Sequence, residues 1–195
     1  MATPTPPRLN HVFHLRGHIG KDTINAGQFR SGPHRRITAL EGGFLRGIPG
    51  TRGDGLDATL IAGGSDWILF DESTNTAHLD VRTQGRTKDG QCVYIHYNGY
   101  LRTDEAAQQF RSWSPDAKTT EFGQHHWWIA PNIEVSGMFA LLPRMNGDRY
   151  KTDDKAMHID PNFKWVATTQ FIGRGRWFKE GDVQAVEYEI FEVAH

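Results

Sequence analysis

The sequence predicts an all-β fold, an antiparallel barrel of about eight or more strands with one short helix and one inserted loop. Three observations support this prediction. Apolar and polar residues alternate at period two in many short segments, as expected for strands with one buried face. Clusters of Gly, Asn or Asp end most of these segments, and only one stretch has helical composition. A β-sandwich is the alternative architecture, since short antiparallel strands also build two packed sheets.

The central stretch, residues 62–99, shows this pattern most clearly. Each of its apolar segments is followed by a turn signal. Asp89-Gly90 separates two alternating segments and predicts a hairpin, because these residues tolerate the positive φ that a type I′ turn requires. Gly63-Gly64 before a strand predicts a bulge or a close approach of the backbone.

The chain is expected to form one domain, because 195 residues fit a single hydrophobic core. Residues 1–10 are rich in Pro and predict a disordered tail, and the barrel domain is placed at residues 11–195. Residues 137–160 show no clear periodicity and interrupt the strand pattern as an insertion. Loops of this length are uncommon without a function, so a lid or an interface element is expected. The alternative is a surface loop with no role.

Further strands are predicted on both sides of the central stretch. The alternating segments are residues 11–20, 35–47, 56–62, 66–70, 163–171 and 183–193. The last of them alternates most cleanly and is expected to close the sheet. Gly173-Arg174-Gly175-Arg176 predicts a turn. Residues 103–111 predict the helix, because Ala, Gln and Glu favour helices and Thr103 or Asp104 can cap it.

Composition argues against several function classes. The formal net charge is −1, which implies no nucleic-acid partner and no membrane partner. The first residues show no apolar signal segment, and Cys92 is the only cysteine, so a cytoplasmic protein without disulfide dependence is expected. Aromatic residues make up 11% of the chain. That content suits a cavity lined by rings, although aromatic rings also fill barrel cores.

Four polar residues of the central strands are the candidate catalytic groups: Asp66, Arg82, Tyr94 and His96. Tyr94 and His96 share one strand face, which Arg82 of the preceding strand can approach. Together with Asp66 they would form a polar floor in an aromatic pocket, able to orient a carbonyl or a phenol and to move a proton. The alternative is a structural ion pair between Arg82 and Asp80 or Asp66.

Mainly aromatic residues are the candidate substrate-binding groups. Indole rings bury a large area and still carry one N–H donor, so a pocket built from them suits a flat, conjugated, moderately polar molecule. The expected contacts are Phe44, Trp67, His126, Trp127, Trp128 and Trp165.

No cofactor and no metal are expected. The chain has ten His residues but no His-x-His or His-Glu-x-x-His spacing, and the adjacent His125 and His126 point to opposite faces of a strand. A dinucleotide site would need a βαβ unit, and a nucleophile elbow would need the pattern Gly-x-Ser-x-Gly. The sequence shows neither pattern.

Several short motifs resemble one known family. They are Glu41-Gly42-Gly43, Gly63-Gly64-x-Asp66-Trp67, Leu79-Asp80-x-Arg82, Thr87-x-Asp89-Gly90 and Gly99. In this order and spacing the chain resembles the domain of unknown function family 3237, which is similar to lipocalin-like (calycin-type) β-barrels. Where that family carries a Tyr-Phe-Arg type segment, this chain has His126-Trp127-Trp128.

The resemblance implies a reaction class but no particular substrate. Similar barrels occur among tailoring proteins of fungal natural-product pathways, which implies a cofactor-independent enzyme of secondary metabolism acting on a small conjugated molecule. A cyclase or isomerase is expected, including a pericyclase such as a hetero-Diels–Alderase. The alternatives are a non-catalytic lipocalin-like small-molecule binding protein and an interaction protein that uses residues 137–160. A homodimer is the default expectation for the assembly.

Overall fold

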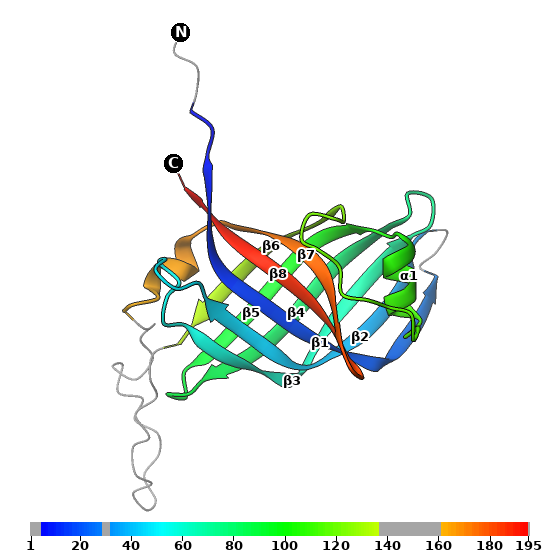
Figure 1. Cartoon of the computed structure of the whole chain (residues 1–195), viewed down its shortest axis with the longest axis horizontal. Helices are drawn as coiled ribbons and strands as arrows, with labels where there is room; N and C mark the ends of the chain where they lie inside the picture. The colour runs from blue at the N-terminus through cyan, green and yellow to red at the C-terminus, as the bar shows by residue number, and fades with distance from the viewer. Residues whose placement is uncertain (1–4, 29–31, 137–160, 195) are drawn as a thin grey trace, which may run out of the picture.

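The structure is a computed structural model that describes residues 5–28, 32–136 and 161–194. Eight antiparallel strands form a closed barrel in which consecutive strands pair and β8 pairs with β1 (Figure 1). The predicted all-β barrel with one short α-helix is confirmed. The strands are β1 (Arg8–Gln28), β2 (His34–Gly47), β3 (Asp57–Asp71), β4 (Thr76–Thr87), β5 (Cys92–Arg102), β6 (Trp127–Val135), β7 (Phe171–Glu180) and β8 (Val183–Ala194).

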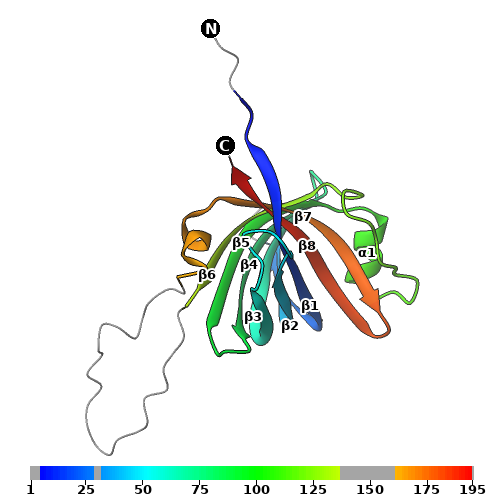
Figure 2. The ribbon, with the colours of Figure 1, turned by 60° about the vertical axis from the view of Figure 1, so that its left-hand side comes forward.

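Two short helical elements lie at opposite ends of the barrel, as Figures 1 and 2 show: α1 (Glu105–Arg111) and the 3₁₀ helix η1 (Lys164–Thr168). The Asp104 side chain caps α1 by accepting a hydrogen bond from the Ala107 N–H at 2.9 Å, as the sequence predicts. Phe110 of α1 is fully buried and stacks on Trp177 of β7, with 4.9 Å between ring centroids. Aromatic packing therefore fixes α1 against the barrel.

The Gly-Gly pair lies within β3, which is one strand rather than the two predicted. The β3–β4 register shifts between Ile61 and Ser65, so the strand contains the predicted bulge. Gly63 has φ of 114°, a value that side chains rarely tolerate. A Cβ on Gly64 would lie 2.7 Å from the carbonyl oxygen of Arg82. The bulge therefore depends on both glycines, and it precedes Asp66 by two residues.

Residues 163–176 differ from the sequence expectation. Residues 164–168 form η1 instead of a strand, and residues 173–176 belong to β7 instead of a turn. The glycines here serve close packing, because a Cβ on Gly175 would lie 2.4 Å from the Trp127 ring. The turn between β7 and β8 contains Gly181, with φ of 55°.

The first strand also starts earlier than expected. Arg8 pairs with Ala194 of β8, so β1 begins within the segment predicted as a tail. The predicted insertion at residues 137–160 lies outside the described residues. Within residues 5–28, 32–136 and 161–194, no helix has the length and apolar composition that crossing a membrane requires.

A buried acid holds three strands together on the outer face of the barrel. Glu187 of β8 is 0% exposed. It pairs with Arg16 of β1 at 2.5 Å and with Arg176 of β7 at 2.6 Å, while His14 Nε2 lies 3.4 Å away. Both arginines are cross-strand neighbours of Glu187 in the register. This cluster is structural, because it lies on the opposite face from the inward-pointing Tyr188.

Candidate functional site

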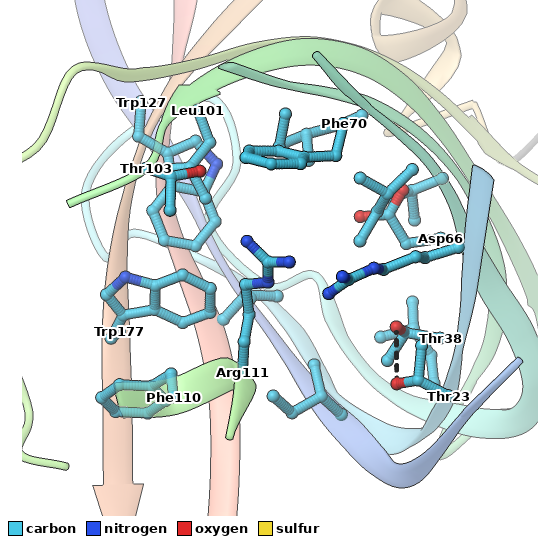
Figure 3. Close-up of a pocket in the computed structure, with 18 of the residues that line it drawn as sticks. Thr23, Thr38, Asp66, Phe70, Leu101, Thr103, Phe110, Arg111, Trp127 and Trp177 are labelled. Atoms are coloured by element: carbon cyan, nitrogen blue, oxygen red, sulfur yellow. Dashed lines mark hydrogen bonds between the residues drawn. The ribbon is translucent and has the colours of Figure 1, made fainter. Parts of the chain in front are cut away.

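The inward side chains near α1 enclose a cavity of about 130 Å³ (Figure 3). Trp127 and Trp177 lie 4.6 Å apart by ring centroids, and Trp127 meets Tyr188 edge-on at 5.4 Å. An apolar cavity of about 150 Å³ holds one benzene molecule, so this cavity is sized for about one ring. Its wall is mainly apolar, and its aromatic members are Phe70, Tyr97, Phe110, Trp113, Trp127, Trp177 and Tyr188.

Asp66 is the acidic group of this cavity. It follows the glycine bulge of β3, and its Oδ1 accepts a hydrogen bond from the Asp80 N–H at 3.1 Å. Burial raises the pKa of the Asp66 carboxyl to about 7, and the nearby Asp80 charge adds to this effect. Protonated and ionised forms therefore coexist at neutral pH, which suits a group that gives and takes a proton.

Two buried phenols accompany Asp66. The rings of Tyr97 and Tyr188 lie 5.3 Å apart, and both residues line the cavity. Burial raises the pKa of each phenol, and the charge of Asp66 raises both further. Both phenols therefore stay neutral at physiological pH and keep a proton that can be donated in a hydrogen bond. Neutral donors of this kind can polarise a carbonyl group without a formal charge.

Two arginines also line the cavity, Arg36 of β2 and Arg111 at the end of α1. Figure 3 shows the Arg111 side chain reaching into the space between Phe70 and Trp177. Its guanidinium carbon lies 4.8 Å from the Phe70 ring centroid, close enough for a cation–π contact. The site thus combines aromatic walls, one titratable acid, two phenols and two cations.

The structure brings only part of the predicted catalytic group together. Asp66 lines the cavity, whereas Arg82, Tyr94 and His96 lie on the outer face, so the expectation of one shared pocket is wrong. The physical reason is the alternation of side chains along a strand. Every second residue of β4 and β5 is buried, and these three residues occupy the positions in between. Arg82 is opposite His96 in the register, as expected. Both contact Asp80, at 3.0 Å and 3.4 Å, which matches the structural ion-pair alternative.

One of the predicted substrate-binding residues lines the cavity, Trp127. Its buried indole N–H has no partner in regular hydrogen-bonding geometry among the described residues, although it interacts with the Tyr188 phenol and lowers the pKa of that phenol. His126 and Trp128, on either side of Trp127, are exposed.

The other three predicted binding residues contact different parts of the barrel. Phe44 packs edge-on against His14 on the outer face at 5.3 Å. Trp67 lies on the outer face of β3, with the Arg82 guanidinium 5.6 Å from its ring. Trp165 of η1 stacks on Phe13, at 5.7 Å. Since strand neighbours alternate between faces, Trp67 cannot share the cavity with Asp66.

Sequence reasoning missed most of the residues that build the cavity. Tyr97 and Tyr188 each lie two residues from a buried isoleucine, Ile95 and Ile190, and therefore on the same face of their strands. This period-two spacing could have predicted that both tyrosines point inward. Arg36 and Arg111 carry no comparable local signal. Within residues 5–28, 32–136 and 161–194, no group of three or more His, Cys, Asp or Glu side chains could hold a metal ion.

The fold and the cavity define a small closed β-barrel with an internal space of ligand size. The chain belongs to the family described as "Protein of unknown function (DUF3237)", whose model matches residues 7–146. The resemblance seen in the sequence motifs is therefore confirmed. No curated protein matches the sequence significantly.

Solved structures from several organisms share this fold. A conserved protein of unknown function from Rhodopseudomonas palustris is 19% identical, with a TM-score of 0.68, covering 98% of this chain and 99% of its own. A β-barrel-like protein from Acinetobacter baumannii is 19% identical, with a TM-score of 0.63 and 99% coverage of both chains. An enzyme from Penicillium herquei is 14% identical, with a TM-score of 0.54, covering 99% of this chain and 98% of its own.

Proposed function

We propose that this protein is a cofactor-independent tailoring enzyme that binds a small conjugated organic molecule inside the barrel and isomerises or cyclises it. The observation that carries this proposal is the Asp66 carboxyl, which faces an aromatic cavity and has a pKa raised by burial to about 7. A perturbed acid in a concave apolar site is a typical feature of catalytic sites. The fold shared with an enzyme from Penicillium herquei supports the same class.

The proposed reaction uses three groups of the cavity. Asp66 in its ionised form removes a proton from the conjugated substrate, and in its protonated form returns a proton to a different atom. The neutral phenols of Tyr97 and Tyr188 donate hydrogen bonds to a carbonyl oxygen on which negative charge develops. Proton removal and return balance within one turnover, so the product is an isomer of the substrate.

The aromatic walls supply orientation. Rings packed at 4.6 to 5.4 Å around Trp127 leave a narrow space, in which a flat molecule has few orientations. Holding two reacting parts of one molecule at attack distance can contribute roughly 7–11 kcal/mol to lowering the barrier. A pericyclic reaction, including a hetero-Diels–Alder addition, needs mainly this contribution and a hydrogen bond to the reacting carbonyl.

The same cavity also suits a lipocalin-like binding protein with no chemistry, and Asp66 distinguishes the two functions. The test incubates the protein with a panel of conjugated enones and phenols that carry an internal nucleophile, and follows isomers of unchanged mass by chromatography. We expect the wild-type protein to convert at least one compound and Asp66→Asn to lose this conversion. Compounds that bind but are recovered unchanged would identify a binding protein.

Matched variants on opposite faces sharpen the test. Tyr97→Phe removes an inward phenol, while Tyr94→Phe removes an outward one that is 38% exposed. The proposal expects slower conversion in the first variant and unchanged conversion in the second. Equal effects of the two variants would contradict the assignment of the reaction to the barrel interior.

A further inference from the structure

Within the described part of the chain, the two cations of the cavity form no ion pair with a carboxylate. Among residues 5–28, 32–136 and 161–194, neither Arg36 nor Arg111 forms an ion pair or a side-chain hydrogen bond. Many other arginines of the same ranges do pair with a carboxylate: Arg16, Arg46, Arg52, Arg82, Arg174 and Arg176. The two cavity arginines are thus left with donors available to a ligand.

The two guanidinium groups also act on each other. Burial lowers the pKa of Arg111, and the positive charge of Arg36 lowers it further. They come from separate elements, β2 and the end of α1, and both line the same cavity. Like charges placed together in a partly buried site repel each other. An anion between them would relieve this repulsion.

The net charge of the cavity lining also favours an anionic ligand. Asp66 is the only carboxyl group among the described lining residues, against two guanidinium groups. Because Asp66 is partly protonated at neutral pH, the described lining carries a net charge between +1 and +2. The nearby hydroxyls of Thr23 and Thr38, 3.2 Å apart, add neutral hydrogen-bonding groups. Apart from Thr103, the remaining side chains of the wall are apolar or aromatic.

We propose that Arg36 and Arg111 bind the carboxylate of a conjugated organic acid whose ring lies in the aromatic part of the cavity. A planar guanidinium matches a carboxylate in a forked, two-bond geometry. The cavity of about 130 Å³ limits the enclosed part of the ligand to about one ring. This inference rests on the proposed small-molecule site and names the class of molecule that it takes.

The test uses trans-cinnamate as the anionic probe and cinnamamide as its neutral isostere. Binding of each probe is measured by saturation-transfer NMR and calorimetry at pH 7.5 and low salt. We expect the wild-type protein to bind cinnamate about tenfold more tightly than cinnamamide, the size of effect that a charge-assisted hydrogen bond produces. Arg36→Gln and Arg111→Gln should each remove most of this preference without changing the affinity for cinnamamide.

Two further variants serve as controls. Arg86→Gln changes an exposed arginine outside the cavity lining and should leave both affinities unchanged. Arg111→Lys keeps the charge but not the fork, so it should recover part of the preference. Equal affinity of the wild-type protein for the two probes, no measurable binding of cinnamate, or a preference that survives in both glutamine variants would overturn the proposal.

The outcomes also separate this inference from the proposed enzyme function. A protein that isomerises panel compounds through Asp66 but binds both probes equally would keep the enzyme function and refute the carboxylate site. A protein that prefers cinnamate through Arg36 and Arg111 but converts nothing would keep the carboxylate site and refute the enzyme function.

Discussion

The backbone N–H of Asp80 donates a hydrogen bond to Oδ1 of Asp66 at 3.1 Å, across the β3–β4 pair. The carboxylate of Asp80 lies on the other face of the sheet, where it contacts Arg82 and His96. One residue thus connects the outer ion cluster to the cavity acid. Through its charge, Asp80 helps burial to raise the pKa of Asp66.

Replacing this charge should shift the titration of the cavity acid. Asp80→Asn keeps the backbone N–H donor and removes a negative charge near Asp66, so we expect the pKa of Asp66 to fall below its wild-type value of about 7. The carboxyl ¹³C chemical shift of Asp66 followed against pH measures this. Asp116→Asn, in an exposed loop, is the control. An unchanged Asp66 midpoint in Asp80→Asn would contradict the assigned coupling.

The raised pKa of Asp66 also predicts how stability depends on pH. The folded protein holds this proton up to a pH of about 7, whereas the unfolded chain releases it near the ordinary value of 3.8. Because the folded state binds more protons in this window, the contribution of Asp66 to stability is present below about pH 4 and is lost as pH rises through 7. Asp66→Asn removes the titration altogether.

The free energy of unfolding of Asp66→Asn, relative to the wild-type protein, should therefore increase between pH 4 and pH 7.5. Urea denaturation of both proteins at several pH values measures this difference, and other titrating groups cancel in the comparison. A difference that stays constant across the range would show that Asp66 titrates normally.

Glu187 should show the opposite behaviour. Burial alone would raise the pKa of Glu187, but the interactions with His14, Arg176 and Arg16 outweigh it and hold the pKa at about 2. Its stabilising contribution is present above pH 4.5 and is lost as the pH falls through about 2. Removing the charge with Glu187→Gln leaves two cations without their counter-charge.

We expect Glu187→Gln to lower the free energy of unfolding at pH 7 by about 3 kcal/mol, the size typical of breaking a buried pair. Chemical denaturation measures the loss. Glu180→Gln, at an exposed strand end, should change stability by less than about 0.5 kcal/mol. A loss as small as that of the control would mean that the cluster does not stabilise the barrel.

Asp104 is expected to stabilise the end of the barrel that contains the cavity. Its side chain caps α1 through the Ala107 N–H and also contacts Nδ1 of His125, whose Nε2 lies 2.8 Å from Thr120 Oγ1. Asp104→Ala should cost about 1 kcal/mol or more, because both contacts are lost. It should also increase amide hydrogen exchange in α1.

Thermal unfolding and hydrogen exchange measure these two effects, with Asp116→Ala as the matched loop control. If α1 positions Arg111, Asp104→Ala should also weaken cinnamate binding more than cinnamamide binding. Unchanged exchange in α1 would show that the cap is dispensable.

The fold was largely predictable from local chemistry. Period-two alternation, the Asp89-Gly90 turn and the Asp104 cap each specify an element through neighbours in sequence, and the structure has a strand pattern, a hairpin and a cap at these places. The hairpin turn is not of type I′, because Gly90 has a positive φ of 85° but Asp89 does not. The Gly63-Gly64 bulge was predictable for the same reason. Gly175 misled the turn prediction, because its lack of a side chain makes room for Trp127 from another strand.

The site was less predictable because it depends on which strand face turns inward. Tyr94 and His96 were chosen for their chemistry, whereas the barrel interior takes the apolar face of β5, which includes Tyr97. In β5, the face that points into the barrel is identified by its apolar residues, and not by the residues with reactive side chains. The placement of Arg36 and Arg111 in one cavity was beyond local reasoning, since it depends on where α1 packs against the barrel, far along the chain from β2.

The pairing of β1 with β8 has a consequence for how the protein is made. Arg8 pairs with Ala194, and the register continues to His18 and Ala185, so the ring is closed by the first and last strands. During synthesis, the nascent chain has no partner for β1 on that side until β8 has left the ribosome. Non-local pairing of this kind slows folding. Until β8 pairs with it, this edge of β1 is open to other chains, so efficient production should depend on chaperones that shield this edge.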